Sequence, residues 1–220
     1  SGGYDFLKQA FPVTIGHEFA GRIASMGDGV ADLQAGQPVV VIPSVECGVC
    51  SFCTAGRLDE CRDRRGIGML RDGGFARSVR VPAINCLALP GDLDLGIAAL
   101  CEPLSIGLSA VKAAEVKYGD KVLVMGPGTI GQGIALLAKA RGADVVVAGY
   151  DDKGRLDGVR ALGIDKTLDL KERPLSDAKQ LSGVDEFDIV IEATGVPSTV
   201  QAGLDLLRPS GVMVICGIHG

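Results

Sequence analysis

Four cysteines in the first third of the chain have the spacing of a metal site. Cys47, Cys50, Cys53 and Cys61 form the pattern C-x2-C-x2-C-x7-C, which we call the cysteine lobe. One loop with this spacing can wrap four sulfurs around a tetrahedral zinc ion, about 2.3 Å from each. Disulfides are the alternative, but an acidic chain without a secretory pattern is typical of the reducing cytosol. We predict a structural zinc site, because four thiolates leave no coordination position open.

A second candidate site is a glycine-rich segment, the glycine loop, with the pattern G-x-G-x-x-G. Its residues are Gly126, Pro127, Gly128, Thr129, Ile130 and Gly131. The loop follows an apolar run, Lys121–Met125, and opens a stretch with helical apolar spacing, Ile130–Ala140. In this context the backbone N–H groups and the helix dipole bind a dinucleotide pyrophosphate. A merely structural turn is the alternative, because the chain holds 32 glycines in 220 residues.

An acidic residue about twenty positions after such a loop often binds the ribose of the dinucleotide. Asp151 stands there, although the preceding strand ends so that Asp151 and Asp152 fall just past the position facing the ribose. Gly149 would leave room for a 2′-phosphate, and Lys153 or Arg155 could pair with it. The choice between NAD and NADP therefore stays open.

A histidine and two glutamates are the remaining candidates for chemistry. His17 lies in the segment Gly16-His17-Glu18, and a lone histidine is more often a hydrogen-bonding residue than a metal ligand. Glu102 stands among apolar residues, where an ionised carboxylate needs a cation, a donor or a proton. Both interpretations of His17 stay open on the residues alone, and His219 is assigned no role.

The elements that must position these residues fall into two parts. Between residues 10 and 89, short β-branched runs separated by turn residues indicate irregular β structure. After residue 121, apolar strands alternate with helices, which predicts an α/β fold with a parallel sheet covered on both faces. The expected strands are Val39–Ile42, Ser78–Val81, Lys121–Met125, Asp144–Ala148, Lys166–Leu170, Phe187–Ala193 and Gly211–Cys216. The expected helices are Ile130–Ala140, Leu175–Leu181, Thr199–Leu207 and a joining stretch, Leu95–Glu115.

The composition argues against several classes of function. The formal net charge is −5 and the isoelectric point is near 5.1, so no broad basic surface is expected for nucleic acid or anionic membranes. The wholly apolar runs are far shorter than the ~18 residues of a membrane span. The first sixteen residues lack a secretory pattern. We expect a soluble, cytoplasmic protein with no nucleic-acid or membrane partner.

Six motifs in chain order resemble the zinc-dependent medium-chain dehydrogenase/reductase family. They are Gly16-His17-Glu18, the cysteine lobe, Gly73-Gly74-Phe75-Ala76, Glu102-Pro103-Leu104-Ser105, the glycine loop and Glu192-Ala193-Thr194-Gly195. The resemblance implies a β-rich catalytic domain of the partly opened barrel type with a zinc lobe, residues 1–103. It further implies a doubly wound Rossmann domain, residues 104–220, with the active site in the cleft between the two domains.

The resemblance also implies roles for individual residues. His17 would be a ligand of a catalytic zinc, and Glu18 its neighbouring or alternative ligand. Glu102 would be the acidic ligand, direct or through water, that sorbitol dehydrogenase-like members use. Together with the glycine loop, the residues assigned to the coenzyme are Asp151, Arg155, Thr194 and Gly195.

The function that the resemblance implies is hydride transfer between NAD or NADP and a polyol or related secondary alcohol. Zinc would lower the pKa of the substrate hydroxyl, and a vicinal diol could reach the metal through two oxygens. The segment starting at Glu102 resembles the polyol version more than the threonine version, where aspartate usually stands. The alternatives are threonine or butanediol dehydrogenase, and a non-catalytic nucleotide-binding redox module.

Two departures from the family pattern concern the ends of the chain. A catalytic cysteine ligand is expected some two dozen residues before the histidine, but only sixteen residues precede His17. Family members also continue beyond the strand Gly211–Cys216, whereas this sequence stops at Gly220. We therefore expect a chain truncated at both ends, with weak or absent turnover by itself, from an intact protein that forms homo-oligomers.

Overall fold

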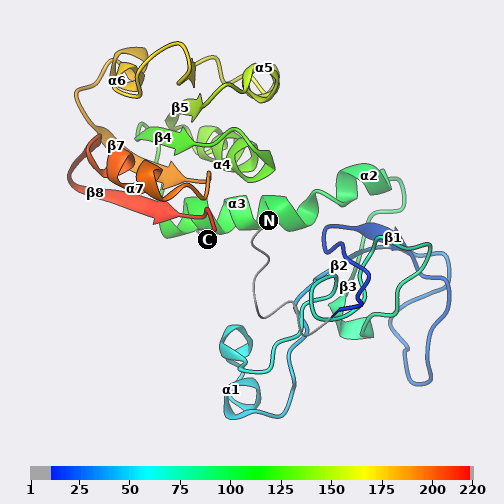
Figure 1. Cartoon of the computed structure of the whole chain (residues 1–220). Coiled ribbons are helices and arrows are strands. Elements are labelled where there is room, and N and C mark those ends of the chain that lie inside the picture. Colours follow the sequence, from blue (N-terminus) through cyan, green and yellow to red (C-terminus); the bar gives the residue numbers. More distant parts are fainter. Residues whose placement is uncertain (1–10, 219–220) are drawn as a thin grey trace. The chain divides into compact units, whose positions relative to one another are not determined.

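The computed structural model describes residues 11–218 of the chain (Figure 1). The described residues fall into two compact units, divided along the chain between Glu102 and Pro103, which we call unit 1 and unit 2. The division falls in the first turn of α3 (Cys101–Ala113). Each unit is described by itself.

Unit 1 contains an antiparallel sheet of three short strands in the order β1-β2-β3. These strands are β1 (Ala20–Arg22), β2 (Pro38–Val41) and β3 (Cys86–Ala88). The central strand, β2, is buried along its whole length, because its β-branched side chains fit a pleated surface that is covered. Short helical turns connect the rest, namely α1 (Ser51–Thr54), η2 (Leu58–Glu60), η3 (Ala83–Asn85) and α2 (Leu95–Ala98).

The expectation of a strand at Ser78–Val81 is wrong, and the strands β1 and β3 were not expected. Residues Ser78–Val81 have no strand assignment, and no described strand pairs with them. Ser78 and Arg80 are exposed, so the apolar content there is too small to bury an edge. The strands β1 and β3 have three residues each, a length at which no period-two pattern can be recognised.

Unit 2 is a five-stranded parallel sheet in the order β6-β5-β4-β7-β8. In chain order its elements are β4 (Lys121–Met125), α4 (Thr129–Ala140), β5 (Asp144–Gly149), α5 (Lys153–Ala161), β6 (Thr167–Asp169), α6 (Asp177–Ser182), β7 (Phe187–Glu192), α7 (Pro197–Leu204) and β8 (Leu207–Ile215). The chain runs outward from β4 to β6 and then returns to β7 on the other side of β4. This order confirms the doubly wound α/β fold, and its topological switch point lies between β4 and β7.

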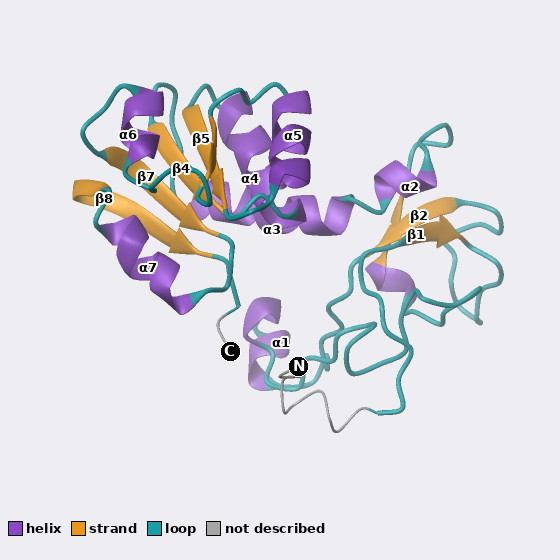
Figure 2. Cartoon of the chain, turned by 45° about the horizontal axis from the view of Figure 1, so that its top comes forward, coloured by secondary structure: helices purple, strands orange, loops and turns teal. Residues whose placement is uncertain are grey.

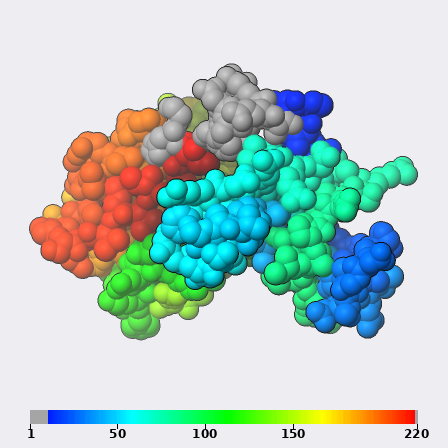
Figure 3. All heavy atoms as spheres, turned by 90° about the horizontal axis from the view of Figure 1, so that it is seen from below, coloured from blue at the N-terminus to red at the C-terminus, as the bar shows by residue number. Residues whose placement is uncertain are grey.

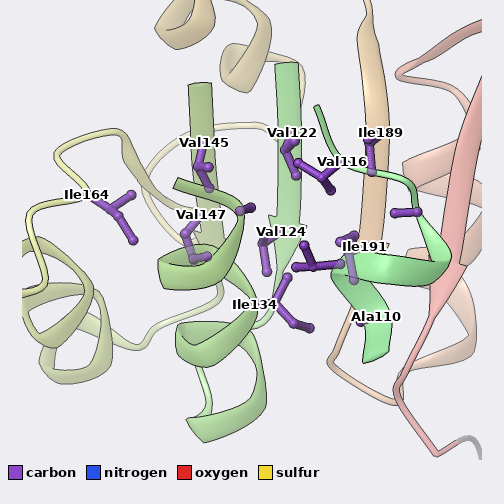
Figure 4. Packing of buried hydrophobic residues seen from close by; sticks show 14 of the residues in the cluster. Ala110, Val116, Val122, Val124, Ile134, Val145, Val147, Ile164, Ile189 and Ile191 are labelled. Carbon is purple, nitrogen blue, oxygen red and sulfur yellow. The ribbon is translucent and has the colours of Figure 1, made fainter. Parts of the chain in front are cut away.

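Alternate residues of β4, β5 and β7 face two separate apolar clusters. Val122 and Val124 of β4 pack with residues of α3, α4 and α5 (Figure 4). Leu123 and Met125 pack with residues of α6 on the opposite face. Figure 2 shows the strands with α4 and α5 on one side and α6 and α7 on the other. Burial of both faces explains why these three strands are largely apolar in the sequence.

The helices of unit 2 differ from expectation in two places. The helix α5 was not among those expected, because only Leu156 and Val159 are buried in an otherwise polar segment. The boundary between α7 and β8 also lies earlier than expected: α7 ends at Leu204, and β8 begins at Leu207. The sequence pattern there is apolar on both sides of the junction, so periodicity alone does not place it.

One helical segment deserves separate description because of its hydropathy. Among residues 11–218, Leu95–Ala113 alone has the length and mean hydropathy, 1.4, of a membrane-spanning helix. No such span was expected from the sequence. Part of this segment packs inside unit 2, where Val111 is fully buried in the cluster beside β4. A Cβ on Gly107 would lie 3.1 Å from the Ile134 nitrogen, so α3 approaches α4 closely. Only 28% of the apolar window is buried, and Leu100 and Ile106 are exposed, so packing in unit 2 accounts for only part of this apolar character.

The core assignment predicts that Phe187→Ala will lower the free energy of unfolding of unit 2 by about 3–5 kcal/mol. Phe187 is fully buried at the start of β7, so truncation leaves a cavity. Tyr118→Ala is the control, because Tyr118 is 90% exposed and its loss should cost less than about 0.5 kcal/mol. Urea denaturation followed by circular dichroism measures both. Equal effects of the two substitutions would contradict the assignment.

Candidate functional site

The four sulfurs of the cysteine lobe lie within 4.8 Å of one another. The Cys47 and Cys53 sulfurs are 3.9 Å apart, and those of Cys50 and Cys53 are 3.5 Å apart. Sulfurs placed tetrahedrally about 2.3 Å from a zinc ion would be separated by about 3.8 Å, whereas a disulfide requires about 2.05 Å. All seven cysteines are free thiols. The donor set and its spacing therefore fit a structural zinc ion.

Backbone N–H groups donate hydrogen bonds to sulfurs of the cysteine lobe, and these bonds favour the thiolate form. The N–H of Cys47 donates to the Cys61 sulfur at 3.3 Å, and the N–H of Cys50 donates to the Cys47 sulfur at 3.4 Å. A hydrogen bond from the backbone of Cys53 is the main cause that lowers the pKa of Cys50 to about 6. Desolvation and the neighbouring Cys50 sulfur raise the pKa of Cys53 to about 12. Four thiols this close cannot all ionise without a cation that offsets their charge.

The segment between the third and fourth cysteines is held by stacked and paired arginines. The guanidinium groups of Arg57 and Arg62 lie 4.9 and 5.1 Å from the centre of the Phe52 ring. Arg57 also donates from Nε to the Glu60 carboxylate at 2.6 Å. These contacts fold α1 and η2 onto each other at the surface, where the lobe is drawn in cyan in Figure 3. Cys53 lies in α1 and Cys61 follows η2, so these contacts help to hold the two cysteines near each other.

The second cluster of possible metal ligands joins His17 and Glu18 to Glu102. One ligand atom from each lies within 4.8 Å of the others, although His17 and Glu102 are more than eighty positions apart in the sequence. All three residues belong to unit 1. His17 and Glu102 are partly buried, and Glu18 is exposed. The structure thus brings together the three residues that the sequence analysis assigned to a catalytic metal.

The position of His17 depends on glycines far along the chain. Backbone N–H groups of residues 73–75 donate to the carbonyls of residues 14–16 at 2.8–3.0 Å. A Cβ on Gly68 or on Gly73 would lie only 2.1 or 2.2 Å from the Gly16 carbonyl oxygen. Gly16 itself has a φ of 104°, in the region that favours glycine. The Gly73-Gly74 motif is therefore required to hold the segment that carries His17.

Glu102 lies in the first turn of α3, where the helix dipole favours a negative charge. Burial raises the pKa of the Glu102 carboxyl; His17 lowers it and Glu18 raises it further. An imidazole and two carboxylates match the nitrogen and oxygen ligands of catalytic zinc sites. Three protein ligands leave one tetrahedral position open for a substrate oxygen. The arrangement fits a catalytic divalent cation.

The three glycines of the glycine loop are required for different reasons. Gly126 has a φ of 107°, and a Cβ there would lie 2.8 Å from the Ala193 carbonyl oxygen. A Cβ on Gly131 would lie 1.8 Å from the Gly126 oxygen, so the helix packs directly on the turn. Gly128 differs, because a Cβ there would meet no atom within 4 Å. A tight turn, an open approach and a close helix contact are the three roles of glycine in a dinucleotide fingerprint.

The glycine loop is placed where a phosphate group can be bound. It joins the carboxyl end of β4 to α4, beside the switch point of the sheet. No described side chain caps the start of α4 at Gly128, and the first N–H groups of a helix have no partner within it. The Gln132 amide donates to the Pro127 carbonyl at 2.9 Å and steadies the loop.

Gly149, which was expected to leave room for a 2′-phosphate, has a packing role in the structure. A Cβ on Gly149 would lie 2.7 Å from the Pro127 ring, so Pro127 already fills that space. Gly149 is required by contact with the glycine loop.

The two acids that follow β5 are each paired with a base. Asp151 is exposed, has a φ of 50° and accepts a hydrogen bond from Lys171 at 2.9 Å. Asp152 precedes α5 and accepts from Arg155 at 2.9 Å. Arg155 therefore lies against Asp152, while Asp151 projects from the end of the strand next to β4.

A third acid, Asp169 at the end of β6, holds this loop from the neighbouring strand. Its carboxylate accepts from the backbone N–H groups of Asp151 at 2.9 Å and Lys171 at 3.0 Å. The hydrogen bond from Lys171 is the main cause that lowers the pKa of Asp169. The loop after β5 thus has its backbone fixed by one side chain and its charges balanced in pairs.

Thr194 and Gly195 follow β7 and lie beside the glycine loop. A Cβ on Gly126 would lie 3.1 Å from the Thr194 methyl group, so the two turns are in contact. Sequence reasoning missed a third residue here, Glu192, which was noted only as part of a motif. The sequence does mark Glu192 as unusual, because it is a carboxylate at the end of a strand in which Asp188 is the other polar residue.

Comparisons with known proteins give consistent matches along the chain. A family model described as "Alcohol dehydrogenase GroES-like domain" matches residues 1–91, and one described as "Zinc-binding dehydrogenase" matches residues 129–220. The chain is 35% identical over 212 residues to a sorbitol dehydrogenase from Halalkalibacterium halodurans, covering 95% of the chain and 62% of the relative.

Two further matches widen the comparison. An L-threonine 3-dehydrogenase from Idiomarina loihiensis is 35% identical over 208 residues, covering 94% of the chain and 61% of the relative. A structure from Sinorhizobium meliloti 1021, solved with NADP bound, has a TM-score of 0.88 and 35% identity. That match covers 95% of this chain and 62% of the solved one. The chain thus spans about three-fifths of the length of these relatives.

The geometry of the cysteine lobe predicts that Cys53→Ser will remove one equivalent of bound zinc per chain. Loss of one thiolate from a closed four-sulfur site should abolish tight binding and lower the melting temperature of unit 1. Cys86→Ala is the matched control, since Cys86 lies outside the lobe and should leave the zinc content unchanged. Metal analysis by mass spectrometry and a thermal melt decide. Unchanged zinc in the serine variant would contradict the site.

The glycine loop predicts opposite effects at two of its positions. Gly128→Ala should leave the free energy of unfolding within about 0.5 kcal/mol, because the new methyl group meets no protein atom. It should weaken NADH or NADPH binding about tenfold by blocking the approach of the pyrophosphate. Gly131→Ala should instead destabilise unit 2, because its Cβ would clash with the Gly126 oxygen. Coenzyme fluorescence titration and urea denaturation separate the two effects, and equal behaviour of the variants would refute this assignment.

Proposed function

Because the chain belongs to the zinc-dependent medium-chain dehydrogenase family, we propose that it carries the metal and coenzyme sites of an oxidoreductase. The reaction we propose is hydride transfer between NAD or NADP and a polyol or a related secondary alcohol. The single observation that carries this proposal is the convergence of His17, Glu18 and Glu102 within 4.8 Å. Those residue types fit a cation with one open coordination position.

In this proposal His17, Glu18 and Glu102 hold the catalytic zinc. A zinc ion bound there supplies a Lewis acid that lowers the pKa of an alcohol hydroxyl and so favours loss of a hydride from its carbon. Glu18, the exposed member of the three, would be the neighbouring or alternative ligand. The protein backbone fixes the ligand geometry through the pairing of residues 14–16 with residues 73–75.

Unit 2 would bind the nicotinamide coenzyme through the glycine loop. The open face of Gly128 and the start of α4 receive the pyrophosphate, and Thr194 and Gly195 form the neighbouring wall. Asp151 follows β5 and Arg155 lies in the first turn of α5, next to the strand end that receives the adenosine ribose in this fold. Asp151 is paired with Lys171 and Arg155 with Asp152, so neither side chain favours one coenzyme outright, and both NAD and NADP belong in the assay.

The substrate class follows from the residue at position 102 and from the relatives. Glutamate at this position resembles the polyol version of the family, and a sorbitol dehydrogenase is among the relatives at 35% identity. A threonine dehydrogenase has the same identity, so L-threonine is the substrate that most directly competes with the polyol proposal. Two hydroxyls on adjacent carbons could approach one metal together, which favours polyols over simple alcohols.

We also propose the setting in which this activity operates. Residues 1–103 form the catalytic domain and residues 104–220 the dinucleotide-binding domain. The protein is cytoplasmic, acts on small molecules without a nucleic-acid or membrane partner, and forms homo-oligomers in its native state. The acidic net charge supports the part of this proposal that excludes a nucleic-acid partner.

Activity of the native gene product tests the substrate class. With sorbitol, xylitol, butanediol or L-threonine and either NAD or NADP, we expect reduced coenzyme to accumulate fastest with a polyol. The absorbance of the reduced nicotinamide measures the rate. Activity with L-threonine alone would reassign the substrate, and no activity with any polyol would reject the proposal.

Metal analysis of the same protein tests the catalytic centre. We expect two zinc ions per chain, and His17→Ala should lose one of them and at least about a hundredfold of the activity. Asp92→Ala is the control, because Asp92 is an exposed acid of the same unit and should change neither quantity. One zinc ion per chain before any substitution would favour a nucleotide-binding module without a catalytic metal.

A further inference from the structure

Glu192 is a fully buried carboxylate that the proposed reaction does not use. It is the last residue of β7, and its ladder partners are Met125 at the end of β4 and Ile215 at the end of β8. A buried charge is costly unless it is paired or hydrogen-bonded, so its retention at the carboxyl edge of the sheet requires a physical reason.

The turn that follows β7 and the first turn of α7 both supply hydrogen bonds to Glu192. Its Oε1 accepts from the backbone N–H of Thr194 at 2.6 Å and that of Gly195 at 3.0 Å. The same oxygen accepts from the Thr194 hydroxyl and from the Thr199 hydroxyl, the latter at 3.0 Å. Burial by itself raises the pKa of Glu192, but these donors outweigh it and hold the pKa below its usual range.

The second carboxylate oxygen faces the chain after β8. A Cβ on Gly217 would lie 2.4 Å from Oε2, so the Gly217 backbone packs directly on the carboxylate. The backbone N–H groups of Cys216 and Gly217 donate to the Glu192 carbonyl at 2.7 and 3.1 Å. One residue therefore joins the turn after β7 to the segment after β8.

This joined structure lies against the glycine loop. The Ala193 N–H donates to the Met125 carbonyl at 2.8 Å, and the Ala193 oxygen would be 2.8 Å from a Cβ on Gly126. The loops after β4, β7 and β8 are thus held at adjacent strand ends, next to the switch point where ligands bind in this fold.

We propose that Glu192 is a positioning residue for the coenzyme: its carboxylate clamps residues 193–196 and 216–217 into the wall that faces the glycine loop. The inference rests on the proposed coenzyme site. The donors are neutral N–H and O–H groups, so the strongest acceptor available, an ionised carboxylate, holds them best. Thr199, in the first turn of α7, takes part by linking the helix to the same oxygen.

Coenzyme affinity tests this role in the native protein. Glu192→Gln keeps the shape but removes the charge, and it should weaken the binding of NADH about tenfold. Thr199→Val removes one donor and should weaken binding about threefold, while Thr199→Ser keeps the hydroxyl and should restore it. The fluorescence of bound NADH or NADPH measures the affinity.

A matched control separates positioning from general stability. Asp144 at the start of β5 is a partly buried carboxylate that accepts from Lys121, Lys166 and the Ser182 hydroxyl. It lies at the amino edge of the same sheet, away from the glycine loop. Asp144→Asn should lower the melting temperature but leave the dissociation constant of NADH within about twofold of the original. A comparable loss of affinity in this control would overturn the proposal.

The comparison of oxidised with reduced coenzyme adds a second criterion. If Glu192 acts only by positioning, its substitution should weaken the binding of NAD and of NADH by the same factor. Substitution of Thr199 should do the same. A changed ratio of the two affinities in Glu192→Gln alone would show a direct effect of its charge on the nicotinamide and would overturn positioning. Hydrogen exchange at the Thr194 and Gly195 amides should also accelerate in Glu192→Gln without coenzyme.

The outcomes for this inference and for the proposed function are distinct. If the unmodified protein binds neither NADH nor NADPH, the proposed function and this inference both fail. If it binds coenzyme and the Glu192 and Thr199 variants bind equally well, only the role of Glu192 fails.

Discussion

The parallel pairing of β4 with β7 is the contact on which the organisation of unit 2 depends. It places Met125 opposite Glu192, and therefore puts the glycine loop and the turn after β7 at the same edge of the sheet. Position 126 must then be a glycine, because its backbone approaches Ala193 too closely for any Cβ. Apolar burial on both faces of the sheet supplies the stability that holds such close backbone contacts in place.

In unit 1 the candidate sites bring groups of like charge close together. Four sulfurs converge in the cysteine lobe, and two carboxylates approach one imidazole at His17. Short loops can bring such groups together only if backbone donors and glycine contacts fix them, as residues 73–75 do for the segment before His17. The repulsion that remains is the physical reason to expect a cation at each cluster.

Spacing and context in the sequence were sufficient to predict the cysteine lobe, the strand-loop-helix unit at Gly126 and the alternation of strands and helices after residue 121. They failed where contacts between residues distant in the sequence determine the role of a residue. The space beside Gly149 is filled by Pro127, and no local pattern indicates that contact. The helix α5 buries only Leu156 and Val159, which is too little for a periodic signal. The meeting of His17 with Glu102 was implied by family resemblance alone, because no rule of spacing joins residues so far apart.

The bridge between Asp151 and Lys171 has a consequence for how discrimination between the two nicotinamide dinucleotides could evolve. The pair is neutral as a whole, and the Asp169 carboxylate holds the backbone beneath it independently of either side chain. Exchange of Asp151 for an uncharged residue would remove an anion and at the same time release the Lys171 ammonium. The net charge of the pair would then change from zero to positive through a single substitution, with the underlying scaffold unchanged.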